Sequence, residues 1–292
     1  MTQGNATFFV SNGYPPKSHL LRDLQLLLTF QDGNQAAIQA PVVPNVCSDS
    51  GSIHVGVLAT MIDVLGGFLA MEIFLPDWMA TANLSIHTAG CVSSGVVSAT
   101  GCIIRSGRST ATVSAEVFSS RAKAARPTDL AGSAMITYSR LEGVRAGSGL
   151  GFDKGRHVDF QLPDGNARLE RHVIDKTGLQ FTEEKSGTTV LDMTEYVRNS
   201  FGSLQGGMIA MMADVAGQSA ARAATGIQLT TADLVLHYLS PGRIGPFTAD
   251  AQVLRSNNVS ALSRVEVKDA GDDQRVIAVA MNTATLEGST PT

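Results

Sequence analysis

The sequence has few cysteines, few aromatic residues and no excess of basic charge. Its three cysteines, Cys47, Cys91 and Cys102, cannot all pair within one chain, and none belongs to a C-x-x-C pair. This pattern favours a reducing compartment and argues against a structural zinc site. The 22 Lys and Arg residues against 26 Asp and Glu residues give a net charge of −4. Because nucleic-acid-binding proteins carry clustered basic charge, we expect no nucleic-acid partner.

The N-terminal residues also show no pattern of a secretion signal. Residues Met1–Val10 are polar and lack a basic start followed by an apolar stretch. The segment Ile53–Leu75 is apolar enough to resemble a membrane span, but Asp63 lies near its middle. A central Asp costs about 2.5–3.5 kcal/mol on insertion scales. We therefore predict a buried helix, no membrane span and a cytoplasmic protein.

The most informative feature is an internal repeat. Ser52–Val64 resembles Ser203–Val215 at an offset of 151 residues, and Thr81–His87 resembles Thr231–His237 at an offset of 150. The matched segments keep their order through both halves, which predicts a duplication.

Two domains follow from the repeat and from the length of 292 residues, since a domain takes about 100–200 residues. We place one in residues 1–145 and the other in residues 166–292. The Gly-rich, polar residues 146–165 between them are typical of a linker.

Each half has the same predicted order of elements. An opening strand (Leu24–Phe30 or Leu179–Phe181) leads through an irregular loop into one apolar helix, and a series of strands follows. These strands are expected at Val97–Arg105, Ala111–Phe118 and Ala134–Leu141, and at Leu234–Leu239, Thr248–Arg255, Leu262–Lys268 and Val276–Leu286. One long helix followed by an antiparallel meander is typical of the α+β class.

One acidic residue recurs inside both apolar helices, as Asp63 and as Asp214. Gly206 and Gly207 begin the second helix, where uncovered backbone N–H groups at the positive end of the helix dipole favour an anion or an oxyanion. Asp214 lies about 10 Å down the same helix, too far to act there. Antiparallel packing of the two helices would bring each Asp to its partner's N-terminus. The duplication therefore predicts two composite sites, and one of them pairs Asp63 with Gly206 and Gly207.

These residues resemble a known family. Asn199–Gly207, followed by Asp214 and Gly217, is similar to the signature of hotdog-fold acyl-CoA thioesterases, most closely the phenylacetate-pathway branch. Asp233–Gly242 resembles the next strand and turn of that family. The resemblance implies two hotdog domains, each an antiparallel sheet around one long central helix, joined as an intramolecular pseudo-dimer. Further association into a homo-oligomer is expected from the family.

The resemblance also assigns the site residues. A complete set consists of Asp63, Asn199, Gln205, Gly206 and Gly207, which we predict to be the active site. The backbone N–H groups would stabilise the oxyanion, Asp63 would act as general base or nucleophile, and Gln205 and Asn199 would orient water or carbonyl.

The other composite site departs from the family pattern. Ser48 stands where the family has Asn, and Val55 replaces the first glycine. His54 and Gly56 remain, so Asp214, His54 and Gly56 form only a possible second site.

Residues that touch the substrate are less clearly marked. Thr81 and Thr231 can reach the sites from a strand start. Arg105, Arg108 and Arg255 could meet coenzyme A phosphates, although solvated arginines at strand ends are the simpler interpretation. His87 and His237 have no partner at metal-ligand spacing, so we expect no metal and no separate cofactor.

The resemblance implies hydrolysis of acyl-CoA thioesters, an activity of fatty acid metabolism. A second hypothesis is a hotdog enoyl-CoA hydratase, which pairs an Asp with a His several residues further on, and neither Asp63 nor Asp214 is followed in that way. A third is a tandem hotdog that binds an acyl thioester without catalysis.

Overall fold

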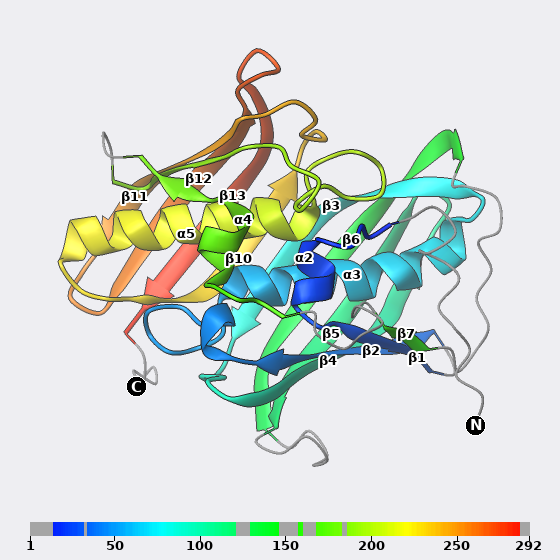
Figure 1. Cartoon of the computed structure of the whole chain (residues 1–292), viewed down its shortest axis with the longest axis horizontal. Helices are drawn as coiled ribbons and strands as arrows, with labels where there is room; N and C mark the ends of the chain where they lie inside the picture. The colour runs from blue at the N-terminus through cyan, green and yellow to red at the C-terminus, as the bar shows by residue number, and fades with distance from the viewer. Residues whose placement is uncertain are drawn as a thin grey trace.

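The structure is a computed structural model that describes residues 14–31, 34–120, 129–145, 157–159, 168–182 and 186–286. In these residues one antiparallel sheet curves around two long helices, α3 (Val55–Phe74) and α5 (Gly206–Thr225), which lie side by side (Figure 1). The strand order is β7-β1-β2-β4-β5-β6-β3-β10-β13-β12-β11-β9-β8. This architecture confirms the predicted α+β class and the two hotdog domains.

The two halves contain matching elements. The first half comprises α2 (Leu20–Asp23), β1 (Leu27–Phe30), β2 (Gln35–Val42), η1 (Pro44–Val46), α3, β3 (Asp77–Thr88), β4 (Gly95–Ser106), β5 (Thr110–Ser120) and β6 (Asp129–Arg145). The second half comprises α4 (Val173–Thr177), β8 (Gln180–Phe181), β9 (Thr188–Leu191), α5, β10 (Thr230–Tyr238), β11 (Phe247–Ser256), β12 (Ser260–Asp269) and β13 (Arg275–Thr285). On either side of the central β3–β10 pair, matching strands of the two halves follow one another in the same order toward the sheet edges. The predicted duplication is therefore present in the fold.

Strand β3 pairs with β10 in antiparallel register, with His87 opposite Asp233 and Asn83 opposite His237. The two domains therefore share one continuous sheet. This pairing confirms the predicted pseudo-dimer.

The irregular loops of the prediction contain strands that the sequence pattern did not reveal. Strand β2 pairs with β1 and β4, and β9 pairs with β8 and β11. Their sequences, Ala-rich with a proline in β2 and only four residues long in β9, carry a weak strand signal. Leu24 was expected in the first strand but caps α2 instead.

The predicted linker, residues 146–165, lies mostly outside the described residues. Within it, β7 (His157–Asp159) adds an edge strand beside β1, with Val158 opposite Leu28. The domain boundaries stay a prediction.

The helices α3 and α5 approach each other closely because a glycine of each helix lies against the backbone of the other. A Cβ atom on Gly56 would lie 2.6 Å from the Cα of Met211, and one on Gly207 would overlap the backbone of Thr60. These contacts place the first turn of each helix against the second turn of the other, which is an antiparallel arrangement. A side chain at either glycine would push the helices apart.

Two histidines connect the halves reciprocally. His19 caps α2 and its Nε2 lies 2.9 Å from the carbonyl oxygen of Arg198. His172 caps α4 and its Nε2 lies 2.7 Å from the carbonyl oxygen of Cys47. Each short helix is thereby tied to the loop that precedes the long helix of the other half. The sequence interpretation gave His172 no role.

Helix α3 is long and apolar enough to cross a membrane by length and composition. In the fold, 78% of that stretch is buried inside the protein, as in the core helix that the sequence predicted. The compartment stays a prediction.

Candidate active site

Asp63 lies on α3 and is partly exposed. The hydroxyl of Thr81 on β3 donates to its Oδ1 at 2.7 Å. The buried Tyr138 on β6 donates to the Asp63 carbonyl oxygen at 2.7 Å, and its hydroxyl lies 3.5 Å from Oδ1. These contacts hold the carboxylate at one position in a residue that is partly exposed.

The same carboxylate sits at the N-terminus of α5, which belongs to the other half. A Cβ atom on Gly206 would lie 2.8 Å from Oδ2 of Asp63, and the N–H of Gly207 donates a hydrogen bond to the carboxylate. Asp63 therefore meets Gly206 and Gly207 as the sequence predicted. The structure corrects one detail, since the Gly207 N–H is already engaged by Asp63, whereas the Gly206 N–H has no partner among the described residues.

Burial raises the pKa of Asp63 from 3.8 to about 6. The hydrogen bonds from Thr81, Tyr138 and Gly207 act in the opposite direction and lower the pKa, but they offset the desolvation only in part. A carboxyl that titrates near pH 6 is ionised at neutral pH and is a stronger base than an ordinary Asp.

Tyrosines surround this carboxylate, and the sequence interpretation missed them. Tyr138 has Ala284 as its counterpart in the other half, because each lies opposite the matched threonine, Thr81 or Thr231. The hydroxyl of Tyr238 donates to the carbonyl oxygen of Gly206 at 3.0 Å. A comparison of the two repeats could have found Tyr138, since this large polar residue corresponds to an alanine, Ala284, in the other half.

Gln205 precedes Gly206 and is 4% exposed. Its Oε1 is buried without a hydrogen-bond partner among the described residues, and its side chain does not cap α5. A buried acceptor without a partner can accept a hydrogen bond from a ligand or from water. Gln205 thus lies where the prediction placed it.

Asn199 has a structural part in the loop before α5. Its Oδ1 accepts the N–H groups of Phe201 at 3.0 Å and Ser203 at 2.9 Å. The predicted role of orienting water or carbonyl is corrected for this oxygen, because two backbone bonds already occupy it. Its counterpart Ser48 serves the same loop in the first half, through a 3.2 Å bond to the Ser52 carbonyl oxygen.

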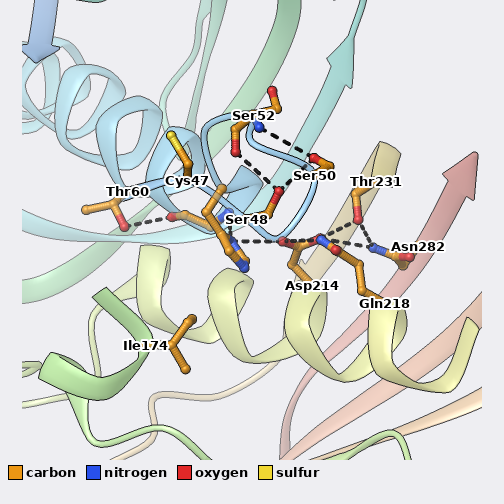
Figure 2. Close-up of polar contacts among 12 residues, drawn as sticks. Cys47, Ser48, Ser50, Ser52, Thr60, Ile174, Asp214, Gln218, Thr231 and Asn282 are labelled. Atoms are coloured by element: carbon orange, nitrogen blue, oxygen red, sulfur yellow. Dashed lines mark hydrogen bonds and ion pairs between the residues drawn. The ribbon is translucent and has the colours of Figure 1, made fainter. Parts of the chain in front are cut away.

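The second carboxylate, Asp214 on α5, is fully buried. Gln218 donates to both of its oxygens at 3.1 Å, and Asn282 donates to Oδ1 at 3.3 Å. The hydroxyl of Thr231 also donates to Oδ1. Figure 2 shows these side chains converging on Asp214 from α5, β10 and β13.

His54 completes the surroundings of Asp214. Its Nδ1 lies 3.0 Å from Oδ2 of Asp214 and 3.2 Å from the N–H of Gly56. Burial lowers the pKa of His54, against the opposing effect of Asp214. The Gly56 N–H donates to Nδ1, so His54 caps α3 while it lies against the carboxylate of Asp214. The predicted second site is therefore assembled, with His54 and Gly56 in place.

The two sites differ in access. Asp63 and Gly206 are partly exposed, whereas their counterparts Asp214 and Val55 are buried. The amide of Gln218 that covers Asp214 has Gly67 as its counterpart at the repeat offset of 151. A Cβ atom on Gly67 would find its nearest neighbour, Met79 Cε, at 3.7 Å, so this position beside Asp63 has room.

The predicted substrate-binding residues are corrected in part. Thr81 and Thr231 do reach the sites, but each hydroxyl is bonded to the helical Asp of its own half. Arg105 and Arg255 lie exposed on β4 and β11. Arg108, in the β4–β5 turn, lies 3.9 Å from Glu142, and both side chains are largely exposed. A phosphate-binding role for these arginines stays a prediction.

His87 has an acidic partner that its position in the sequence did not reveal. Its Nδ1 lies 2.7 Å from Oδ1 of Asp233 on the neighbouring strand β10, at the exposed junction of the halves. This contact joins the two halves across the β3–β10 pair.

Two hotdog domains in one sheet, with facing helices, define a double-hotdog protein. A family model described as thioesterase superfamily matches residues 50–124 and again residues 201–276. The chain belongs to the thioesterase superfamily. No curated protein sequence matches it significantly.

Solved structures share the fold at low identity. The tesB protein of Mycobacterium avium subs paratuberculosis is 11% identical with a TM-score of 0.61, covering 88% of this chain and 94% of its own. An acyl-ACP thioesterase from Bacteroides thetaiotaomicron is 13% identical with a TM-score of 0.55, covering 86% and 98%. The 12:0-ACP thioesterase of Umbellularia californica is 8% identical with a TM-score of 0.56, covering 86% and 94%.

The two carboxylates predict opposite effects on stability. The raised pKa of Asp63 means that its contribution to stability is complete below pH 3.8 and is lost as the pH rises through about 6. At pH 8 we expect Asp63→Asn to increase the free energy of unfolding by about 1–3 kcal/mol. Asp214→Asn should reduce the free energy of unfolding by about 2–4 kcal/mol. The NH₂ group of the new side chain would face the N–H donors of Gln218 and Asn282, and these donors would lose their acceptor. Urea denaturation measures both.

A second pH provides the control for this comparison. At pH 5 Asp63 is mostly protonated, so the advantage of Asp63→Asn should shrink, whereas a shift of both variants in the same direction at pH 8 would contradict the assignment.

Proposed function

We propose that the chain hydrolyses acyl-CoA thioesters to a carboxylic acid and coenzyme A, at the site of Asp63. The observation that carries this proposal is the partly exposed residue Asp63 beside the Gly206 N–H at the start of the partner helix, which has no partner in the described part of the chain. A base and an oxyanion donor at one accessible point are what acyl transfer to water requires.

The thioester carbonyl oxygen would accept the N–H of Gly206. This group lies at the positive end of α5, so it stabilises the negative charge that develops on the oxygen. Tyr238 bonds to the Gly206 carbonyl oxygen at 3.0 Å and fixes the orientation of this first helical residue.

Asp63 supplies the base. As general base it takes a proton from water while the water oxygen bonds to the carbonyl carbon. The tetrahedral intermediate then collapses, the C–S bond breaks, and the proton passes to the leaving thiolate. The same carboxylate could instead attack directly and form a mixed anhydride, which water then hydrolyses. Both routes release the same acid and thiol, and neither needs a metal or a separate cofactor.

Gln205 would position the water. Its counterpart at the repeat offset of 151 is His54, which lies 3.0 Å from Asp214, and this correspondence supports a role for Gln205 toward Asp63. The unpaired Oε1 of Gln205 can accept one proton of a water molecule whose other proton points to Asp63.

The two other hypotheses predict different products. An enoyl-CoA hydratase would hydrate the acyl chain without thiol release, and a binding protein would do neither. The His54–Asp214 pair has the side chains of a hydratase, but Asp214 is fully buried. The burial of Asp214 favours a structural role for the His54–Asp214 pair.

Hydrolysis should depend on one carboxylate. Asp63→Asn should lower the rate of thiol release by at least about 100-fold, because an amide is neither base nor nucleophile. Asp214→Asn should retain most of the activity at a temperature where it remains folded. Thiol release from a panel of acyl-CoA thioesters measures both variants. Equal losses in the two variants would mean that the sites share the work, and no release from any thioester by the natural protein would refute the proposal.

Access to Asp63 should depend on Gly67. In Gly67→Gln the new amide can cover Asp63 as Gln218 covers Asp214, so thiol release should fall by at least about 10-fold while the protein stays folded. Gly67→Ala is the matched control, since its methyl group fits the 3.7 Å spacing and should cause a much smaller loss. Similar losses in both variants would show that the added amide does not act through Asp63.

A further inference from the structure

Three side chains form a stack across the two halves, beside the proposed active site. Trp78 on β3 and Phe201 in the loop before α5 have ring centroids 6.1 Å apart and planes 16° apart. The guanidinium carbon of Arg243 lies 5.6 Å from the Phe201 centroid. Each element leads into the site, because β3 carries Thr81 and the Phe201 loop leads to Gly206.

The loop that carries Arg243 is held firmly. The N–H groups of Arg243 and Ile244 donate to Oδ2 of the buried Asp269 at 2.8 and 3.0 Å, and Gly245 donates to Oδ1 at 2.7 Å. The neighbouring Gly242 accepts the N–H of Leu204 at 2.8 Å, which ties this loop to the loop of Phe201. The position of the guanidinium is thus fixed by both its backbone and the aromatic ring.

The guanidinium of Arg243 is exposed, and no ion pair neutralises it in the described part of the chain. The arginines that do form described ion pairs are Arg108, Arg140, Arg222, Arg264 and Arg275. A cation that is stacked on a ring, held in place and unpaired is available to an anion.

The stack is absent from the other half of the duplication. At the repeat offsets of 151 and 150, the counterparts of Phe201, Arg243 and Trp78 are Ser50, Ser93 and Gln228. None of these has a ring or a charge. The stack therefore occurs on the elements that carry Thr81 and lead to Gly206, next to the partly exposed Asp63, and not on their counterparts around the buried Asp214. Two independent differences between the halves mark the same site.

We propose that Arg243, held over Phe201 and Trp78, binds the phosphate-bearing arm of coenzyme A. This inference rests on the proposed function and names the group that it recognises. A guanidinium donates two parallel hydrogen bonds to a phosphate, and its flat face and the rings offer stacking surfaces to adenine.

The stack suits the arm of free coenzyme A better than it suits the acidic surface of a carrier protein. A carrier would need several unpaired cations around the stack. Arg140, which lies opposite Met79 and next to the stack, is already neutralised by Asp77 through a 2.7 Å bond. A single oriented cation with aromatic rings matches a small anionic nucleotide.

The test compares substrates with and without the phosphates. The same acyl group is presented as the coenzyme A thioester and as the N-acetylcysteamine thioester, which lacks phosphate and nucleotide. Arg243→Gln should raise KM for the coenzyme A thioester by about 10-fold, the loss of a charge-assisted contact, with little change in kcat. It should not raise KM for the short thioester. Arg264→Gln, at an exposed arginine on β12 that pairs with Glu266, is the matched control and should alter neither KM.

A binding measurement separates this inference from the proposed hydrolysis. By calorimetry, coenzyme A should bind the natural protein more tightly than pantetheine does, and Arg243→Gln should remove the difference. If thiol release fails but this difference is found, the proposed function is wrong and the phosphate site stands. If both variants and the natural protein show equal KM for the coenzyme A thioester and equal coenzyme A binding, the inference is overturned. An effect of Arg243→Gln on an acyl-carrier-protein substrate alone would also overturn it, in favour of a carrier partner.

Discussion

The close crossing of α3 and α5 is the constraint on which the rest of the structure depends. Gly56 and Gly207 allow each helix to touch the backbone of the other, and their antiparallel order sets each helical Asp at the end of the partner helix. The site of Asp63 therefore does not exist in either half alone. The shared β3–β10 pairing and the reciprocal contacts of His19 and His172 hold the halves in the register that this crossing requires.

The two equivalent carboxylates of the duplication have different surroundings. Asp214 is buried, and donors from Gln218 and Asn282 satisfy its oxygens. Asp63 keeps fewer donors and a pKa raised to about 6, so its ionised form costs stability at neutral pH. A destabilised, accessible carboxylate is what catalysis needs, and a fold that retains a second, satisfied copy can tolerate that cost.

Much of this arrangement could be predicted from the sequence, because the repeat is read directly. The matched Asp63 and Asp214, the glycines at the helix start and the rise of a helix were enough to pair Asp63 with Gly206 across the halves. The partners that distinguish the two sites could not be predicted in this way. Asn282 lies 68 residues from Asp214, and Tyr138 lies 75 residues from Asp63, so only the strand register brings them together. The strands β2 and β9 were missed because their short or Ala-rich sequences carry little pattern.

The most direct test of the central claim is the pH dependence of kcat/KM for thioester hydrolysis, measured with the natural protein and with Thr81→Ala. The account predicts that activity rises through about pH 6 as Asp63 loses its proton, and that Thr81→Ala moves this inflection upward, because the lost hydrogen bond stabilised the ionised carboxylate. A rate that is flat between pH 5 and 7, or an inflection that Thr81→Ala leaves unmoved, would contradict the assignment of Asp63 as the catalytic group.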